Sequence, residues 1–355
     1  MVDWTQSMQQ TFEYYIVDPG TWKEVKRIDT VLSSNIDRDA TTDTLETATI
    51  NVTETLGECY VRIYLITIQN GITEKHCLGT FLVQTPNLSF NGYRQDLSLD
   101  AYSPLVELKE KNPPIGYSIL KDEYILDNAY RIVRESVRAP VIPPELEDNT
   151  KKLKDDFVAN LDENWCHFII DLIDNANYEL RLDEKSQIMF AVKQKPAAMK
   201  PVYTFNDDNS SILLPEISVN RDLYGIPNVV EVIYTASRHN YSARVVNNNP
   251  DSPVSVKSRG REIVHRVVNP NMGGMPSQLQ VENYAKRTLE ELSSLEYTVS
   301  FSHGYCGTRL GDCVRLNYKK AGIEDIKAKI ISQSITCKTG CQVTEKATFT
   351  TNLWR

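Results

Sequence analysis

The chain has 355 residues, of which 41% are hydrophobic and 24% charged, and a formal net charge of −8. This composition is typical of a globular protein of two or three domains and excludes collagen-like, disordered and coiled-coil chains. No apolar run approaches the roughly 20 residues needed to span a bilayer, and no signal-peptide core follows Met1, so we expect a protein made in a cytoplasm and not inserted in a membrane.

The charge is distributed unevenly along the chain. Residues 1–60 hold 11 acidic and 4 basic residues, for a net charge of −7, whereas residues 235–355 hold 10 and 17, for a net charge of +7. An acidic front and a basic back argue against a simple nucleic-acid binder and favour complementary contacts with neighbouring proteins or with further copies of the chain.

The first hundred residues predict an antiparallel barrel or sandwich. Asn70-Gly71 and Asn91-Gly92 are strong signals for tight hairpins, and Pro19-Gly20 marks a turn. Runs rich in aromatic and β-branched residues or with alternating polarity predict strands. These runs are 11–17, 22–32, 44–52, 60–68, 74–84 and 93–102.

The middle of the chain predicts a compact α+β part. Residues 123–138 carry apolar side chains on one helical face, with Asp122 as the expected N-cap. Apolar residues recur at helical spacing in 150–161, and 165–173 reads as a second, more hydrophobic helix. Residues 178–183 and 187–192 flank a short polar turn and predict a small hairpin.

Strands are predicted again from Pro201 onward. A long polar loop follows residue 246, and the helix 277–293 begins with a capping box formed by Ser277 and Gln280. The expected strands are 212–219, 229–235, 243–246, 296–301, 312–318, 325–336 and 343–351.

The search for catalytic motifs finds no nucleophile elbow, phosphate loop, dinucleotide fingerprint or H-E-x-x-H. His76 and Cys77 allow a nucleophilic pair with a distant acid, but ordinary strand residues are the favoured interpretation. The acids between Glu145 and Glu163 suggest glycosidase carboxylates, yet interleaved lysines favour a solvated surface. No catalytic, cofactor-binding or metal-ligating residue is therefore assigned. The five histidines, at positions 76, 167, 239, 265 and 303, lie far apart in the sequence.

Seven cysteines spread over a long chain predict free thiols. The C-terminal set comes close to a zinc pattern without matching it, so zinc and a disulfide remain open as minor alternatives to unligated thiols. This set is His303, Cys306, Cys313, Cys337 and Cys341.

Basic residues gather around the polar loop, and a solvated or protein-facing loop explains them better than sequence-specific nucleic-acid binding does. These residues are Arg238, Arg244, Lys257, Arg259, Arg261 and Arg266.

Three stretches resemble the baseplate hub proteins of phage tails, the family of late control protein D and of the N-terminal part of type VI spike proteins. Residues 78–108 resemble the family's Gly-x-Phe strand, hairpin and closing strand. Residues 165–192 are similar to its helix and hairpin. Residues 228–318 share the order of strand, Asp-Ser-Pro loop, Gly260-Arg261, helix and Gly-Asp turn.

The resemblance implies an α+β, mainly β fold: two tail-tube-like antiparallel β-barrels and an inserted α+β domain. The expected division is a first barrel at 1–105, the α+β insert at 106–200, a second barrel at 201–240 and 296–355, and a loop and helix at 241–295. Because the chain stops soon after its last predicted strand, at Trp354-Arg355, any spike or hydrolase is expected on a separate polypeptide.

The implied function is structural. A homotrimeric hub in the virion's tail baseplate, assembled in the bacterial cytoplasm, would adapt the six-fold tail tube of a phage or contractile injection system to a three-fold central spike. The expected partners are further copies, the tail tube or distal tube protein, the spike, the tape measure protein and wedge or sheath proteins, with no cofactor. The alternatives are a tail-associated cell-wall hydrolase or carbohydrate-binding tail protein, and a six-fold distal tail protein.

Overall fold

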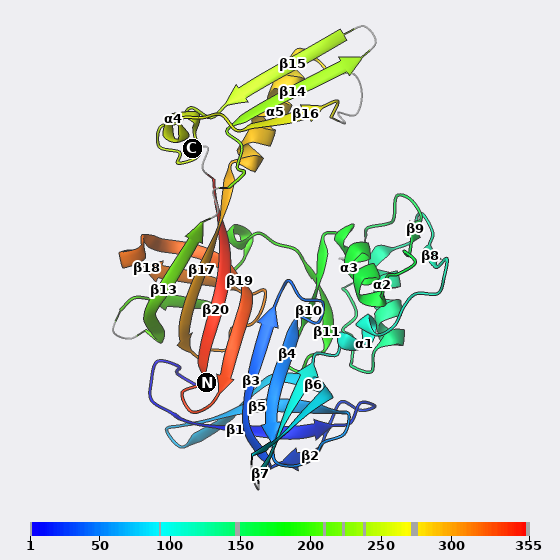
Figure 1. Cartoon of the computed structure of the whole chain (residues 1–355), viewed down its shortest axis with the longest axis vertical. Coiled ribbons are helices and arrows are strands. Elements are labelled where there is room, and N and C mark those ends of the chain that lie inside the picture. The colour runs from blue at the N-terminus through cyan, green and yellow to red at the C-terminus, as the bar shows by residue number, and fades with distance from the viewer. Residues whose placement is uncertain are drawn as a thin grey trace. The chain divides into compact units, whose positions relative to one another are not determined.

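The computed structural model describes residues 2–91, 94–145, 150–208, 211–221, 224–236, 239–270 and 276–352. Contacts divide the chain into two compact units. The main unit holds residues 1–217 and 300–347, and the small unit holds residues 218–299 and 348–355. Helices and strands are drawn in Figure 1. Within the described residues, no helix has the length and apolar character needed to cross a bilayer.

The first β-domain is an antiparallel sheet in the order β2-β1-β5-β6-β7-β4-β3. Asn70 and Gly71 both adopt positive φ, as the predicted tight turn between β5 and β6 requires. The hairpin of β6 and β7 also forms, although Gly92 of its predicted turn lies outside the described residues. The strands are β1 (Gln9–Val17), β2 (Glu24–Ile28), β3 (Val31–Asp39), β4 (Glu46–Val52), β5 (Cys59–Gln69), β6 (Ile72–Asn91) and β7 (Arg94–Tyr102).

The second β-domain follows the order β13-β17-β20-β19-β18-β12, in which β12 and β18 are parallel. Its long strand β19 (Ile323–Cys337) pairs with β18 through residues 323–329 and with β3 through residues 332–337. One strand therefore belongs to both β-domains and joins them into a continuous sheet. The other strands are β12 (Tyr203–Asn206), β13 (Leu213–Arg221), β17 (Ser294–Gly304), β18 (Cys313–Tyr318) and β20 (Gln342–Asn352).

The insert of the main unit packs α2 (Ile125–Ser136) and α3 (Trp165–Asp174) around one apolar core, which includes Ile132, Phe168 and Leu172. Asn164 caps α3 by accepting a hydrogen bond from the amide of His167 at 2.9 Å. The remaining elements are α1 (Val106–Lys109), β8 (Ser118–Ile119), β9 (Phe157–Val158), β10 (Tyr178–Leu182), β11 (Ile188–Val192) and the 3₁₀ turn Pro196–Ala198.

Two predictions for the insert are wrong. Residues 150–161 contain the short strand β9 and no helix, because Leu153 exchanges backbone hydrogen bonds with Asp122 and Glu123 instead of bonding within its own segment. Asp122 adopts a positive φ of 66° and does not cap α2, because the helix begins two residues later with Tyr124 as its N-cap. The fold class itself, mainly β with an inserted helix-containing part, is confirmed.

The small unit is a three-stranded sheet covered on one face by α5 (Gln278–Leu292). Strand β14 (Val229–Ala236) lies between antiparallel β15 (His239–Val246) and parallel β16 (Val264–Val268). Val281, Ala285 and Leu289 of α5 pack on β14 and β15. The predicted capping box of Ser277 and Gln280 is confirmed. The sequence missed β16 and α4 (Val256–Arg259), which follow the predicted polar loop.

Candidate functional site: the junction of the β-domains

A buried ion cluster lies where the two β-domains meet. Arg38 on β3 and Glu46 on β4 are almost fully buried, and Arg38 Nε lies 3.0 Å from Glu46 Oε1. Arg309, in the loop between β17 and β18, places Nη2 2.8 Å from the same oxygen. Two guanidinium groups thus share one carboxylate, and both burial and repulsion from Arg309 lower the pKa of Arg38.

Hydrogen bonds extend this cluster across the second β-domain. The Arg38 guanidinium donates to Gln333 Oε1 on β19 and to the Leu78 carbonyl on β6. Gln333 Nε2 donates to Glu345 Oε1 on β20 at 2.5 Å and to the Thr308 carbonyl at 2.9 Å. The network therefore ties β3, β4 and β6 to β19 and β20, and it fixes the positions of the two β-domains relative to each other.

His303 and Glu345 form a second buried pair, and both side chains are fully buried. His303 Nδ1 donates to the Gly304 carbonyl at 2.7 Å, while Nε2 lies 3.4 Å from Glu345 Oε2. An acceptor thus lies near each ring nitrogen, an arrangement that favours the protonated imidazolium form. Burial disfavours this charged form, but interactions with Cys306 and Glu345 outweigh it and raise the pKa of His303 to about 10.

This pair predicts a loss of stability in alkali. A histidine pKa raised from 6.5 to about 10 contributes stability that is complete below pH 6.5 and disappears as the pH rises through 10. The difference in unfolding free energy between the wild type and His303→Gln should therefore be largest at pH 6 and should shrink toward pH 10. Urea unfolding at pH 6, 8 and 10 measures it, and parallel pH profiles for the two proteins would contradict the assignment.

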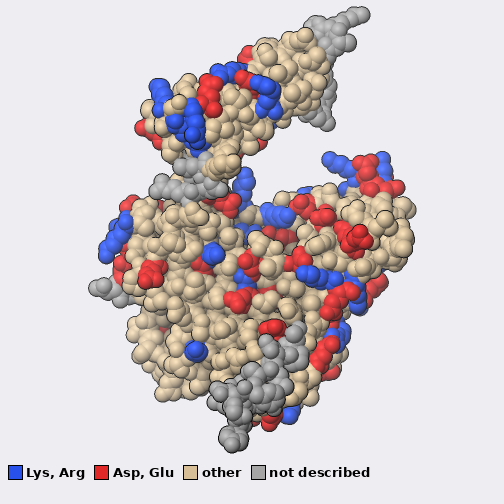
Figure 2. All heavy atoms as spheres, viewed as in Figure 1, with Lys and Arg blue, Asp and Glu red and all other residues tan. Residues whose placement is uncertain are grey.

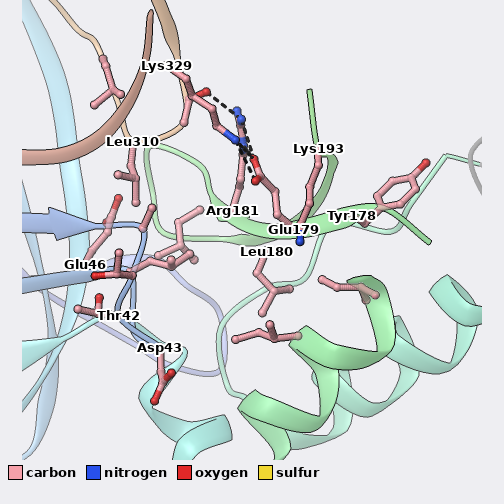
Figure 3. Close-up of a pocket in the computed structure, with 18 of the residues that line it drawn as sticks. Thr42, Asp43, Glu46, Tyr178, Glu179, Leu180, Arg181, Lys193, Leu310 and Lys329 are labelled. Atoms are coloured by element: carbon pink, nitrogen blue, oxygen red, sulfur yellow. Dashed lines mark hydrogen bonds and ion pairs between the residues drawn. The ribbon is translucent and has the colours of Figure 1, made fainter. Parts of the chain in front are cut away.

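A cavity of about 390 Å³, called here the junction cavity, opens beside the ion cluster (Figure 3). Its lining comes from the β3–β4 turn, α3, β10, the loop before β18, and β19, so all three parts of the main unit contribute. Leu180 points toward α3 in Figure 3. The lining is largely apolar and includes Leu45, Ile170, Ile173, Leu180, Leu310 and Ile330.

One wall of the junction cavity carries a second group of two cations and one carboxylate. Glu179 accepts from Arg181 Nε and Lys329 Nζ, each at 2.9 Å, as the dashed lines in Figure 3 show. Arg181 also donates to the Gly311 carbonyl at 2.8 Å. Gly311 has φ of 84°, a conformation that favours glycine, and a Cβ there would lie 2.7 Å from Arg181 Cζ, so a larger residue would displace this guanidinium.

The structure does not make a nucleophilic site of His76 and Cys77. His76 Nε2 lies 3.1 Å from Thr67 Oγ1, and its ring contacts Trp4 and Tyr305. Burial raises the pKa of the Cys77 thiol to about 11, which keeps it protonated at neutral pH. Both are strand residues of β6, as the favoured interpretation of the sequence holds.

The described acids between Glu145 and Glu163 lie in the insert, where two of them accept hydrogen bonds from backbone amides. Asp156 Oδ1 accepts from the Lys121 amide at 2.8 Å, and Glu163 Oε2 accepts from the Asn160 amide at 2.8 Å. Asp155 and Asp162 are exposed, and Glu147 and Asp148 lie outside the described residues. Among the described acids, Asp162 and Glu163 line a shallow, open surface pocket together with Leu161 and Ile170, and Asp162 is exposed, unlike a catalytic acid held in an apolar site.

The histidine and cysteines of the considered zinc set are not brought together. His303 Nδ1 and Cys306 Sγ are 3.8 Å apart, but within the described residues no three metal-ligating side chains converge. All seven cysteines are free thiols in the structure.

The basic residues of the polar-loop region have different surroundings in the small unit. Arg244 and Arg266 both bind Glu231 at the centre of the open sheet face, and hydrogen bonds from Arg266 and Arg244 lower its pKa. Arg259 donates to the Ile226 carbonyl, whereas Lys257 and Arg261 are exposed. Arg238 lies outside the described residues. Figure 2 shows basic side chains gathered over the α4 end of this unit.

No known protein-family profile and no curated protein sequence matches the chain. Several solved structures, in contrast, do match the chain. A tail protein from Neisseria meningitidis MC58 superposes with a TM-score of 0.62 at 12% identity, over 95% of this chain and 96% of that one. The 43 kDa tail protein of prophage MuSo2 from Shewanella oneidensis gives 0.59 at 8% identity, over 95% and 97%.

A chain of the lidded Francisella PdpA-VgrG complex gives a TM-score of 0.59 at 9% identity, and the match covers 97% of this chain and 53% of that one. At these identities the comparisons establish the fold. The chain has the fold of phage tail proteins, and the resemblance inferred from its sequence is confirmed at that level.

The sequence analysis missed the junction residues, although a signal for them exists. In β4, the side chain of Glu46 lies on the same buried face of the strand as those of Ala48, Ile50 and Val52. In β3, every second side chain is buried, and Arg38 lies on the same buried face as Ser34 and Ile36. A charged residue in phase with the apolar face of a strand indicates a buried partner elsewhere in the fold.

Proposed function

We propose that the chain is a non-enzymatic baseplate hub in the virion of a phage or in a phage-derived contractile injection system. Three copies would form a ring that adapts the six-fold tail tube to the three-fold central spike. In this proposal each copy supplies two tube-like positions, its first β-domain and its second β-domain. The insert at 106–200 and the segment 241–295 would face other components.

The observation that carries the proposal is the rigid pairing of two β-domains in one main unit. Strand β19 is shared between them, and the Arg38–Glu46–Arg309 cluster ties them together. Three copies with two fixed β-domains each present six positions, which is the number that a six-fold tube requires. The likeness to tail proteins over nearly the whole of both chains supports the same role.

The proposed partners follow from that position in the tail. The ring would contact its own copies, the tail tube or distal tube protein, the central spike, the tape measure protein and wedge or sheath proteins. The virion's baseplate would be its location, after assembly in the bacterial cytoplasm. The matched VgrG-complex structure supports contact with a spike component.

The acidic residues of the first 60 positions are less available for contacts between copies than the sequence alone suggests. At least six of the 11 acids in residues 1–60 pair with arginine or lysine inside the main unit, so the negative charge of that segment is largely neutralised there. They are Glu13, Glu24, Asp29, Asp43, Glu46 and Glu58. On the α4 loop, Lys257 and Arg261 are exposed. We place the basic side of the copy-to-copy contact at this loop.

Reversing these two charges is expected to weaken the trimer. Lys257→Glu with Arg261→Glu should shift the trimer's dissociation to at least about tenfold higher protein concentration and reverse its salt dependence. Sedimentation at several salt concentrations measures both effects. Lys286→Glu, an exposed change on α5 of the same unit, is the matched control. Equal behaviour of the double variant and the control would remove the α4 loop from the contact.

A further inference from the structure

The junction cavity has the size and lining of a small-molecule site. Its volume of about 390 Å³ falls within the range of roughly 300–1,000 Å³ that such sites occupy. Leucine and isoleucine side chains from α3, β10, β19 and two loops contribute to its largely apolar lining. Because these elements belong to one unit whose parts are tied together, the cavity is preformed and requires little ordering before it binds a ligand.

Two groups of charged side chains meet at the cavity: Arg181, Lys329 and Glu179 belong to its lining, and the Arg38–Glu46–Arg309 cluster reaches it through Glu46. Glu179 lies between Arg181 and Lys329, and Glu46 lies between Arg38 and Arg309, so each group has two cations and one carboxylate. At the opposite side Asp43 is already paired with Lys109 and His167, each at 3.1 Å. Although burial opposes it, these hydrogen bonds lower the pKa of Asp43.

Several donors of these cations remain available. Lys329 has three N–H donors and gives two of them to Glu179. Arg181 has five and uses two, one to Glu179 and one to the Gly311 carbonyl. An anionic group entering the cavity would satisfy unused donors in an environment of low dielectric constant, where such bonds are strong.

We propose that the junction cavity binds a small amphiphile with one negative charge, a carboxylate on an apolar body. The apolar body lies against Ile170, Ile173 and Leu180, and the carboxylate accepts hydrogen bonds from Lys329 and Arg181. This site goes beyond the structural role of the hub and does not depend on it.

Three probes with the same chain length test the chemistry. Octanoate, 1-octanol and octylammonium are titrated into the full-length protein by isothermal calorimetry. Octanoate should bind at one per chain, more tightly than octanol, and octylammonium should not bind. Absence of octanoate binding at millimolar concentration, or equal binding of all three probes, overturns the proposal.

Variants locate the site. Lys329→Met should weaken octanoate binding by at least about tenfold, since it removes a charged hydrogen-bond donor. Lys327→Met, two residues earlier on the same face of β19, is the matched control, because Lys327 binds the carbonyls of Ala197 and Met199 outside the cavity. Ile170→Trp fills the cavity and should abolish binding while the melting temperature stays near that of the wild type. Equal affinities for the two lysine variants, or undiminished binding to Ile170→Trp, would place the octanoate elsewhere.

Discussion

Replacing Glu46 with glutamine is expected to destabilise the main unit by about 3–5 kcal/mol, the cost of leaving buried charges without their counter-ion. Glu46 is the carboxylate that both Arg38 and Arg309 contact, and its side chain is 3% exposed. With glutamine, two buried guanidinium groups remain next to each other without a neutralising partner. Urea unfolding followed by circular dichroism measures the change.

Two further variants make this prediction specific. Arg38→Met should cost less, about 1–3 kcal/mol, because it relieves the repulsion from Arg309 but leaves the acceptors on Gln333 and Leu78 unsatisfied. Glu58→Gln removes a surface partner of Arg138 that is 60% exposed, and should cost about 0–1 kcal/mol. If Glu46→Gln were no more harmful than Glu58→Gln, the buried cluster would not be what holds the β-domains together.

Truncating Phe205 to alanine is expected to lower the free energy of unfolding by about 3–5 kcal/mol. Phe205 on β12 is fully buried, and its ring lies 5.2 Å from that of Phe301 and 4.5 Å from that of His303. Thr204→Ala, the exposed neighbour on the same strand, should change stability by less than about 0.5 kcal/mol.

The Phe205 variant also tests the coupling of the two β-domains. Phe205 belongs to the second β-domain and Glu46 to the first, yet both substitutions should lower the midpoint of the same cooperative transition, because β19 serves both sheets. Fluorescence and circular dichroism should give coincident curves in each variant. Two separated transitions in Phe205→Ala, with the first β-domain unaffected, would show that the domains unfold independently.

Local signals in the sequence were sufficient for the elements whose geometry is set locally. The Asn70-Gly71 turn and the Ser277–Gln280 capping box depend on a few neighbouring residues, and both form as predicted. Residues 150–161 have helical spacing of apolar side chains, but their backbone bonds go to residues 122 and 123, which lie far away in the sequence. Periodicity cannot reveal such competition, so the helix prediction failed there.

The junction could be anticipated only in part. The parity of Arg38 and Glu46 with their apolar neighbours indicates that both are buried, but their separation from Arg309 and Gln333 by more than 250 residues leaves the partners unidentified in the sequence. A similar separation in the sequence lies between β3 and the half of β19 that pairs with it. Charge counting along the chain likewise could not show that much of the acidic segment is neutralised within its own unit.

The mass of the purified assembly tests the proposed hub role most directly. Each chain has a mass of 40.4 kDa. Native mass spectrometry, or light scattering after size exclusion, should give the mass of three chains, and on dilution the variant that combines Lys257→Glu with Arg261→Glu should fall to the mass of one chain at an at least about tenfold higher protein concentration than the wild type. A stable assembly of six chains, or a single chain at every protein and salt concentration, would contradict the trimeric ring.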